Sequence, residues 1–290
     1  MTEQKNKIET AQSVLVTGAA GLLGSYVTRA FKDADYKVTG VDIAQHDGLD
    51  VTVADLTRLD AALELVRNVD HVVHIASLPR PVGYDVQDVY NTNMSLMFNV
   101  VEAMERNKIN SLIYASSFST IGLPFANKPL APDYFPVDSQ HPTKAMDVYA
   151  LTKLLGENIV DYWVARTGGD AISIRMPWIQ DTHIFARDVL PRRDTDDAKL
   201  DLWAYVDARD AARAFILSSQ AKLRGHNRFF ISAADTYSKH MSVELIERFY
   251  PGVALKEPLE GFASLISNRE AETLIGFRPR HSWREYGQFK

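Results

Sequence analysis

Short apolar runs and amphipathic stretches alternate along the first 176 residues of the chain. Runs that suit buried strands occupy 13–17, 36–43, 47–56, 70–77, 111–117 and 170–176. Apolar residues at helical spacing fill the stretches between them, at 22–31, 57–68, 86–106 and 144–167. Strands that alternate with helices predict a parallel sheet with helices on both faces, the doubly wound α/β fold.

The pattern becomes less regular after residue 176. A strand leading into a helix is expected at 201–220, a further strand at 227–233, and short helices at 242–250 and 268–277. We therefore divide the chain into a polar, frayed tail at 1–12, a first domain at 13–176 and a smaller C-terminal lobe at 177–290 built onto the same sheet. In such a fold, ligands bind at the carboxyl ends of the strands.

The composition narrows the classes of protein. The 290 residues are 46% hydrophobic and 24% charged, with a net charge of −5, and no run of Lys and Arg occurs. We therefore expect no nucleic acid partner. No stretch approaches the about 18 uninterrupted apolar residues of a membrane span. Cysteine is absent, which excludes disulfides and fits a cytoplasmic location.

A glycine-rich turn lies between the first strand and the first helix. In "TGAAGLLG" (17–24), Gly18, Gly21 and Gly24 surround the start of a helix that opens with Leu22 and Leu23. Glycine lets the backbone approach a pyrophosphate closely, and the helix start offers unpaired N–H groups to the phosphates. This strand–turn–helix context is the one that a dinucleotide-binding Rossmann fingerprint requires.

An acid follows at the end of the second strand. Asp42 lies 18 residues after Gly24, where a carboxylate accepts the hydroxyls of the adenosine ribose and repels a 2′-phosphate. No Arg follows in "DIAQHDG", so we predict NAD rather than NADP. Asp55 and Leu56 are expected beside the adenine, and Ile75, Ala76 and Ser77 beneath the cofactor. His71 and His74 are three apart on a strand and face opposite sides, so no metal site is predicted.

The stretch "VYALTK" (148–153) places Tyr149 and Lys153 four residues apart in a predicted helix. Residues at this spacing share a helix face. Taken alone, the pair is more often an accident of sequence than a reactive centre. Its significance depends on the rest of the chain.

These features together resemble the extended short-chain dehydrogenase/reductase superfamily, in particular its NAD-dependent epimerase/dehydratase branch. The matches run in order through "TGAAGLLG", Asp42, "ADL", "HIAS", Asn93, "SSFSTIG", "YALTK", "SIRMP", "YVDARDAARA" and "LIGFRP". The resemblance implies a catalytic serine at Ser117, with Ser119 as the weaker candidate, acting with Tyr149 and Lys153. It also implies a cofactor site lined by Ile43, Asn93, Tyr149, Lys153 and Met176 besides the residues already named.

The implied chemistry explains the residue types. Oxidation of an alcohol by hydride loss also removes the hydroxyl proton, and a tyrosine phenolate accepts it. Free tyrosine titrates at about pH 10. An ammonium at about 4 Å stabilises the phenolate by about 4 kcal/mol at an effective dielectric of about 20, which corresponds to about three pKa units. We therefore expect Lys153 to lower the pKa of Tyr149.

The substrate is less clearly indicated. The sequence reads "IRMPWIQDTH" where nucleotide-sugar enzymes of this branch usually carry an Asn, and the C-terminal lobe is short. Both departures favour a small sugar, sugar acid or related hydroxy compound. Predicted substrate contacts are Ser77, Arg80, Ser117, Phe118, Ser119, Arg175 and Trp178, with His183 and Arg187 as further cations and Leu123 and Phe185 as further apolar wall.

Three functions remain open at this point. The leading one is an NAD-dependent dehydrogenase. The second is an epimerase or dehydratase that keeps NAD bound, and the third is a non-catalytic NAD-binding protein. The helices at 86–106 and 144–167 commonly form a dimer interface in this superfamily, so we also expect a homodimer.

Overall fold

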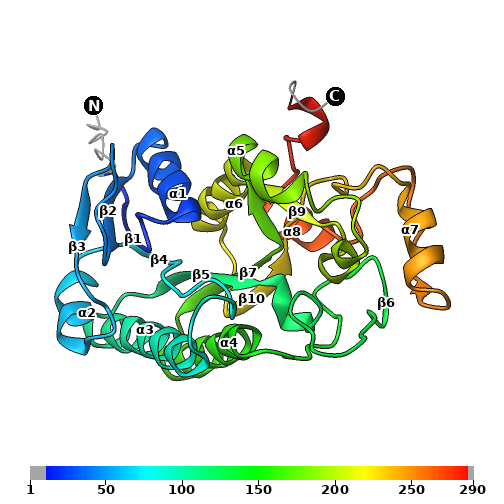
Figure 1. Cartoon of the computed structure of the whole chain (residues 1–290). Helices are drawn as coiled ribbons and strands as arrows, with labels where there is room; N and C mark the ends of the chain where they lie inside the picture. Colours follow the sequence, from blue (N-terminus) through cyan, green and yellow to red (C-terminus); the bar gives the residue numbers. More distant parts are fainter. Residues whose placement is uncertain (1–10, 287–290) are drawn as a thin grey trace, which may run out of the picture.

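The central element is a seven-stranded, fully parallel sheet. The computed structural model describes residues 11–286, so the predicted tail lies, up to residue 10, outside the described residues. The strand order β10-β7-β5-β4-β1-β2-β3 confirms the predicted doubly wound α/β fold (Figure 1). The strands are β1 (Ser13–Thr17), β2 (Lys37–Asp42), β3 (Val51–Val53), β4 (His71–His74), β5 (Ser111–Ser117), β7 (Asp170–Met176) and β10 (His226–Phe230).

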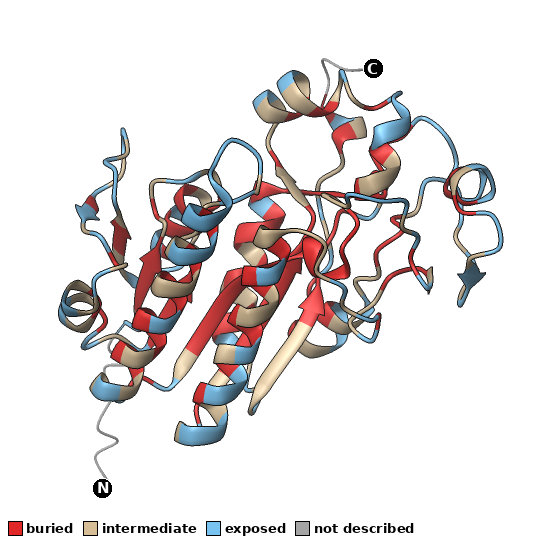
Figure 2. Ribbon diagram, turned by 60° about the horizontal axis from the view of Figure 1, so that its bottom comes forward, coloured by how far each residue is buried: buried red, intermediate tan, exposed pale blue. Residues whose placement is uncertain are grey.

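Helices cover both faces of this sheet (Figure 1). One layer contains α1 (Leu22–Asp33) and α6 (Ala208–Gln220), and the other contains α2 (Leu59–Leu65), α3 (Val86–Asn107) and α4 (Val148–Thr167). The alternation of a strand decides which layer each side chain meets. Val14 and Val16 belong to the core under α1 and α6, whereas Leu15 belongs to the core over α3 and α4. The strands are accordingly buried between two helical layers (Figure 2).

The predicted helix ends are close to the observed ones, with one exception. Gly168 ends α4 in the left-handed conformation, directly after the predicted end at residue 167. The predicted helix began at Thr57, but α2 begins at Leu59 and Arg58 occupies the N-cap position. The Thr57 side chain and backbone N–H instead donate to Asp55 Oδ1, at 2.7 and 2.9 Å. A short turn around Asp55 therefore takes the hydroxyl that a capping role required.

Most of the smaller lobe comes from the chain after β7, which then returns to the sheet. The lobe contains a two-stranded parallel sheet of β8 (Trp178–Gln180) and β9 (Tyr205–Asp207). The chain then forms α6, in a helical layer of the main sheet, and β10, a strand of the main sheet. The remaining elements of the lobe are α5 (Thr182–Ile184), a π-helical turn (Phe185–Val189), α7 (Ser242–Phe249), a small sheet of β6 (Tyr134–Phe135) and β11 (Ala254–Leu255), and α8 (Arg269–Ile275), which packs back near β10.

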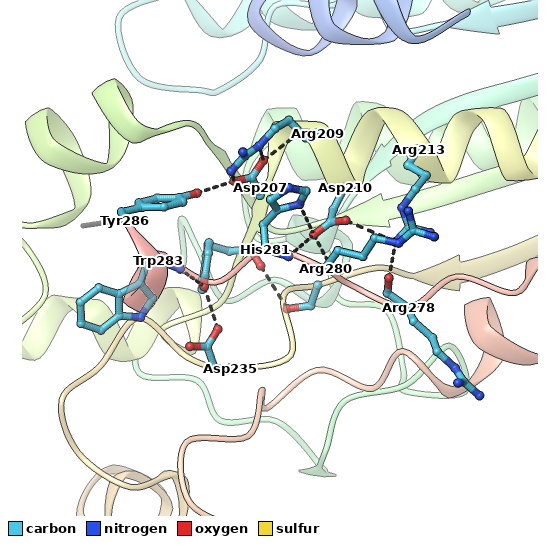
Figure 3. Close-up of polar contacts among 12 residues, drawn as sticks. Asp207, Arg209, Asp210, Arg213, Asp235, Arg278, Arg280, His281, Trp283 and Tyr286 are labelled. Atoms are coloured by element: carbon cyan, nitrogen blue, oxygen red, sulfur yellow. Dashed lines mark hydrogen bonds and ion pairs between the residues drawn. The ribbon is translucent and has the colours of Figure 1, made fainter. Parts of the chain in front are cut away.

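Buried carboxylates fasten the C-terminal segment across this lobe (Figure 3). The Tyr286 hydroxyl donates to Asp207 Oδ2 at 2.5 Å. The backbone N–H groups of Arg280 and His281 both donate to Asp210 Oδ2 at 2.8 Å. Hydrogen bonds to charged groups are stronger than those between neutral groups. The segment is held by its backbone and by the side chains of Ser282, Trp283, Arg284 and Tyr286, and it closes the apolar core of the lobe.

The parallel arrangement gathers the carboxyl ends of the strands at one edge of the sheet. Thr17, Asp42, His74, Ser117 and Met176 end β1, β2, β4, β5 and β7 respectively. The predicted chemistry therefore collects at this edge, next to the smaller lobe. Among the described residues, no helix combines the length and the apolar character needed to cross a bilayer.

Candidate active site

The glycine turn after β1 is shaped by close contact with the loop after β4. Gly18 has a φ of +74°, and a Cβ at this position would lie 2.7 Å from the backbone nitrogen of Ala76. A Cβ at Gly24 would lie 1.9 Å from the carbonyl oxygen of Gly18. Side chains at either position are therefore excluded. Gly21 is the N-cap of α1 and provides no side-chain cap, so the first turn of α1 keeps the donors that a phosphate needs.

Asp42 is anchored at the end of β2 beside this turn. Its Oδ2 accepts from the N–H of Ala20 at 3.0 Å, and its Oδ1 accepts from the N–H of Ala44 at 3.2 Å. Each carboxylate oxygen retains a second lone pair. The geometry fits a role in which Asp42 accepts the hydroxyls of an adenosine ribose. The site as a whole fits NAD, because an open glycine cradle, an uncapped helix start and an acid meet in one place.

Residues 75–77 join the glycine turn to the predicted catalytic pair. Thr17 Oγ1 accepts from the N–H groups of Ile75 and Ala76 at 3.1 and 3.2 Å, so its own proton goes to His74 Nδ1 at 2.9 Å. Burial, with a smaller contribution from the charge of Lys153, lowers the pKa of His74 to about 3. His74 is therefore neutral, carries its proton on Nε2 and has a structural role.

Asn93 and Leu56, both predicted to bind the cofactor, make contacts within the protein around the site. Asn93, on α3, accepts from the N–H of Leu78 at 2.7 Å and donates to Thr152 Oγ1 at 3.1 Å. It thereby links the loop after β4 to α4. Leu56 is buried, and its carbonyl accepts from Asn99 at 3.1 Å. Ile43 and Asp55 are exposed beyond β2 and β3, where an adenine is expected.

Ser117 ends β5 and meets Ser119 within the same turn. Ser117 Oγ accepts from the N–H of Ser119 at 3.0 Å and from its hydroxyl at 2.9 Å. Because Ser119 already donates to Ser117, the proton of Ser117 is free for a third group, and a hydrogen bond joins Ser117 to Tyr149. This arrangement favours Ser117 over Ser119 as the residue that faces a substrate oxygen.

Tyr149 lies in the first turn of α4, one turn before Lys153, as the spacing predicted. Burial raises the pKa of the Tyr149 hydroxyl to about 12, the hydrogen bond from Ser117 opposes this, and the carboxylate of Asp147 adds to it. The expected lowering by Lys153 is therefore not found in the chain itself. The Lys153 Nζ lies 5.6 Å from the centre of the Tyr149 ring.

The environment of Lys153 explains this difference. Its Nζ donates to the carbonyl of Ala115 at 2.7 Å and to Ser77 Oγ at 3.4 Å. Burial lowers the pKa of Lys153 to about 7, and Glu157 opposes that shift. Near neutral pH the amine carries only part of its charge, so its attraction for a phenolate is weaker than a full ammonium would provide. The two groups therefore titrate as a coupled pair.

Arg175 was predicted to meet an anionic substrate, and the structure gives it a different position. Only 4% of it is exposed, and its Nε and one terminal nitrogen donate to the two carboxylate oxygens of Glu157, at 2.9 and 2.7 Å. The guanidinium also lies over the ring of Phe230. Arg175 therefore joins β7 to α4 below the site. Met176, the next residue, is buried at the end of β7.

The predicted apolar substrate wall is mostly core. Phe118, Leu123 and Phe185 are buried and pack together in the core of the smaller lobe. Trp178 is half-buried at the edge of the same cluster. Of these side chains, Trp178 retains exposed surface for contact with a substrate.

Two predicted cations, Arg80 and Arg187, both act on Asp188. Arg187, in the π-helical turn, makes a bidentate pair with Asp188 at 2.7 Å. Arg80, in the loop after β4, is exposed. The pKa of Asp188 is lowered mainly by its hydrogen bond to Arg187, burial opposes this lowering, and the charge of Arg80 adds to it. His183 is exposed one turn before Arg187. π-Helical turns are rare and frequently mark functional sites.

Sequence reasoning missed three residues that surround the catalytic pair. Asp147 caps α4 through the N–H of Ala150 at 2.9 Å and faces Tyr149. Tyr114 places its ring 5.0 Å from Lys153 Nζ. Glu157 lies one turn beyond Lys153. The spacing of Tyr149, Lys153 and Glu157 in steps of four was visible in the sequence and indicated a shared helix face.

With this geometry established, comparison with known proteins identifies the family. Residues 14–180 match the NAD dependent epimerase/dehydratase family. The chain belongs to this family. The prediction made from "TGAAGLLG", Asp42 and "YALTK" is thereby confirmed, and the family name specifies the predicted cofactor, NAD.

Relatives with assigned activities include both dehydrogenases and epimerases. An L-arabinose 1-dehydrogenase (NAD(P)(+)) of Haloferax volcanii is 31% identical over 57% of this chain and 66% of its own length. A uronate dehydrogenase of Pseudomonas syringae pv. tomato is 29% identical over 56% of this chain and 58% of its own length. A UDP-glucose 4-epimerase of Corynebacterium glutamicum is 23% identical over 93% of this chain and 91% of its own length. The matched part of the chain thus spans less than two thirds of the two dehydrogenases.

Solved structures share the fold. A short-chain dehydrogenase/reductase superfamily protein from Agrobacterium tumefaciens with bound NAD superposes with a TM-score of 0.72 at 19% identity, over 93% of both chains. MoeE5 in complex with UDP-glucose and NAD gives a TM-score of 0.70 at 21% identity, over 94% of this chain and 95% of that one. At these identities the comparison supports the fold and not a particular substrate.

Proposed function

We propose that the protein is an NAD-dependent dehydrogenase that oxidises a hydroxyl of a small sugar, sugar acid or related hydroxy compound. Tyr149 is the base, Ser117 orients the substrate oxygen, and Lys153 supports both the phenolate and the cofactor ribose. Gly18, Gly24 and Asp42 hold the cofactor. The two relatives with the highest identities quoted above are named as sugar-oxidising dehydrogenases, which supports this class.

One observation carries the proposal: residues 75–77 contact both halves of the site. Ala76 packs against Gly18 so closely that a side chain there is excluded, and Ser77 accepts from Lys153 Nζ at 3.4 Å. The cofactor turn and the Tyr–Lys pair, about 130 residues apart in sequence, are therefore adjacent at one sheet edge. A site that aligns a cofactor with a base and a hydroxyl donor provides the proximity that hydride chemistry needs.

The residues of the chain divide the work of the reaction among them. NAD, held by Gly18, Gly24 and Asp42, would supply the acceptor for the hydride of the substrate carbon. Ser117 donates a hydrogen bond to the substrate oxygen and fixes its distance from Tyr149. Tyr149 takes the hydroxyl proton as the carbonyl forms. Lys153 compensates the negative charge of the phenolate, because its amine is held by Ala115 and Ser77 on the inner side of the tyrosine.

The substrate side supports a singly charged or neutral compound over a nucleoside diphosphate. Arg187 lies in the π-helical turn and the charge of Arg80 also acts on Asp188, whose carboxylate neutralises one of these two positive charges. The remaining single positive charge matches one carboxylate. Trp178, half-buried beside Ser117's turn in the lobe core, suits contact with a sugar face.

The alternative is an epimerase, for which the Corynebacterium relative, aligned over nearly the whole chain, is the supporting observation. The decisive experiment mixes the protein with NAD and, in turn, L-arabinose, uronic acids, aldonic acids and UDP-glucose, and follows the absorbance of NADH. We expect stoichiometric NADH with a small sugar or sugar acid. Interconversion of UDP-sugars without free NADH would contradict the proposal in favour of the epimerase. NAD binding without turnover of any compound would favour the non-catalytic alternative.

We also propose that the protein is a homodimer that pairs α3 and α4 with the same helices of a second copy. Large apolar side chains are exposed on the outer faces of these helices: Tyr90, Phe98, Leu151 and Tyr162. On each helix they lie at spacings that keep them near one ridge. An ion pair of 2.7 Å between Arg166 and Glu105 holds the two helices side by side. Exposed apolar residues grouped in this way commonly mark interfaces.

A further inference from the structure

A carboxylate is buried directly behind the catalytic lysine. Glu157 follows Lys153 by one turn of α4, on the same helix face, and only 1% of it is exposed. A buried carboxylate costs several kcal/mol unless it is paired. Its position therefore requires a compensating arrangement, and the residues around it provide one.

Three groups from three strands surround this carboxylate. Arg175, on β7, donates two hydrogen bonds, and Ser116, on β5, donates one of 2.6 Å to Glu157 Oε1. Arg228, on β10, approaches Oε2 at 3.3 Å. Burial alone would raise the pKa of Glu157, but the hydrogen bonds and charge of Arg175, with Ser116 and Arg228, bring it below its usual value. Glu157 is therefore a fixed negative charge.

Lys153 occupies the other side of this charge. Its Nζ lies between two tyrosine rings, with centroids at 5.0 Å for Tyr114 and 5.6 Å for Tyr149. The neutral His74, stacked on Tyr114, faces it from β4. Ala115 and Ser77 accept its hydrogen bonds but bring no charge. Glu157 is the carboxylate that favours the ammonium form in these surroundings.

We propose that Glu157 is a positioning residue for the reaction, which supplies the buried negative charge that raises the share of the Lys153 amine in its ammonium form. Arg175 and Ser116 hold the carboxylate in place for this purpose. The proposal rests on the proposed function, because it assigns the charge state of the lysine on which the Tyr149 base depends. The order of charges is Arg175, Glu157, Lys153 and then the phenolate of Tyr149, alternating in sign.

A purely structural ion pair between α4 and β7 is the competing explanation. Buried ion pairs contribute little stability compared with apolar residues of the same size, so stability alone does not account for the pair. The next turn of α4 offers an internal comparison. Asp161 also pairs with Arg228 and with His226, at 2.9 Å for the histidine, yet it is 49% exposed by side chain and lies two turns from Lys153. It ties α4 to β10 without acting on the lysine.

The test compares Glu157→Gln with Asp161→Asn. The chain is labelled with [6-¹³C]lysine, the Lys153 signal is assigned by its loss in Lys153→Arg, and its midpoint is followed as the pH is raised. We expect a wild-type midpoint near 7, a midpoint lower by about one pH unit or more in Glu157→Gln, and an unchanged midpoint in Asp161→Asn. In the pH profile of kcat/KM, Glu157→Gln should move the acid limb to lower pH and reduce the plateau.

The coupled titration of Lys153 and Tyr149 determines the direction in which the limb and the plateau change. Removing the negative charge favours loss of the lysine proton, so the limb moves down, while the neutral amine no longer stabilises the phenolate, so the plateau falls. A structural defect would lower activity without moving the limb. Because Glu157→Gln leaves Arg175 with a weaker partner, Glu157→Met combined with Arg175→Met provides a second variant in which the pair is replaced by apolar volume.

An unchanged lysine midpoint in folded Glu157→Gln and in the double variant would overturn the proposal. The lysine titration does not require a substrate. If no compound is oxidised but the midpoint shifts as expected, the proposed dehydrogenase activity fails while the role of Glu157 in setting the charge of Lys153 stands. If turnover occurs and the midpoint does not shift, the dehydrogenase activity stands and the proposed role of Glu157 fails.

Discussion

Replacing Tyr149 by Phe removes one oxygen atom and, on the present assignment, the base of the reaction. The structure allows the effect to be estimated. A phenol with a pKa of about 12 is ionised in about one molecule in ten thousand at about pH 8, which corresponds to about 5 kcal/mol. The wild-type reaction must recover this energy from Ser117, Lys153 and the cofactor charge. Without the hydroxyl no such base exists, so we expect kcat to fall by about a hundredfold to ten-thousandfold.

The pH profile provides a sharper version of the same prediction. Because Lys153 has a pKa of about 7 and Tyr149 of about 12, the first proton of the pair is lost near pH 7, mainly from the lysine. The reactive form, an ammonium beside a phenolate, carries the same number of protons as a neutral amine beside a phenol. The kcat/KM of the wild type should therefore rise with pH up to about 7 and then level off. Tyr149→Phe should show a low profile without this limb.

The assay is NADH formation with the best compound of the substrate panel, with NAD affinity measured separately by isothermal titration calorimetry. Tyr114→Phe is the matched control, because it removes a tyrosine hydroxyl from the other ring beside Lys153, 5.0 Å away. We expect NAD to bind Tyr149→Phe within a fewfold of the wild-type affinity. Near-normal turnover by Tyr149→Phe, or an equal loss in Tyr114→Phe, would refute the assignment of Tyr149 as the base.

Three further predictions address the cofactor, the assembly and the stability of the fold. Asp42→Asn removes the charge expected to face the adenosine ribose. The KM for NAD should rise about tenfold, which corresponds to the loss of about 1.5 kcal/mol for a hydrogen bond to a charged group. A wild-type enzyme that prefers NADP tenfold would contradict this role. Phe98→Glu places a charge in the proposed interface, at a position where the phenylalanine is 48% exposed in the single chain. Light scattering should then show the mass of one chain instead of two. A monomeric wild type would contradict the dimer. His74 has a folded pKa of about 3, below its unfolded value of about 6.5, so the unfolded chain alone takes up its proton and stability falls as the pH drops from 6.5 towards 3. Urea unfolding at about pH 5 should show a loss of about 2 kcal/mol from this group relative to neutral pH, and His74→Asn should lack this part of the loss; an equal loss in that variant would show that other groups cause it.

Several features were predictable because they depend on residues close together in the chain. The strand, glycine turn and helix at 13–33 follow from local composition and spacing. The acid at Asp42 follows from its distance to Gly24. Tyr149 and Lys153 share a face because helix geometry alone requires it. The family resemblance then assigned roles to these residues.

Other features depended on which elements pack together. Arg175 ends a strand on the substrate side, and an anion-binding role was a reasonable prediction. Its partner, Glu157, belongs to a helix on one face of the sheet, and only the packing of α4 over β7 brings the two together. The core positions of Phe118 and Phe185 depended in the same way on the fold of the lobe. Apolar side chains near a strand end fit either a substrate wall or a core until their neighbours are known.

The sequence by itself determined the fold class, the cofactor turn and the spacing of the catalytic pair, because periodicity and turn chemistry act over a few residues. The tertiary structure decided the electrostatics of the site. Burial lowers the pKa of Lys153 and raises that of Tyr149, and no local pattern encodes how much water a side chain loses when distant strands and helices close around it. The same closure sets the charge of Glu157 behind the lysine, and with it the state in which the pair meets a substrate.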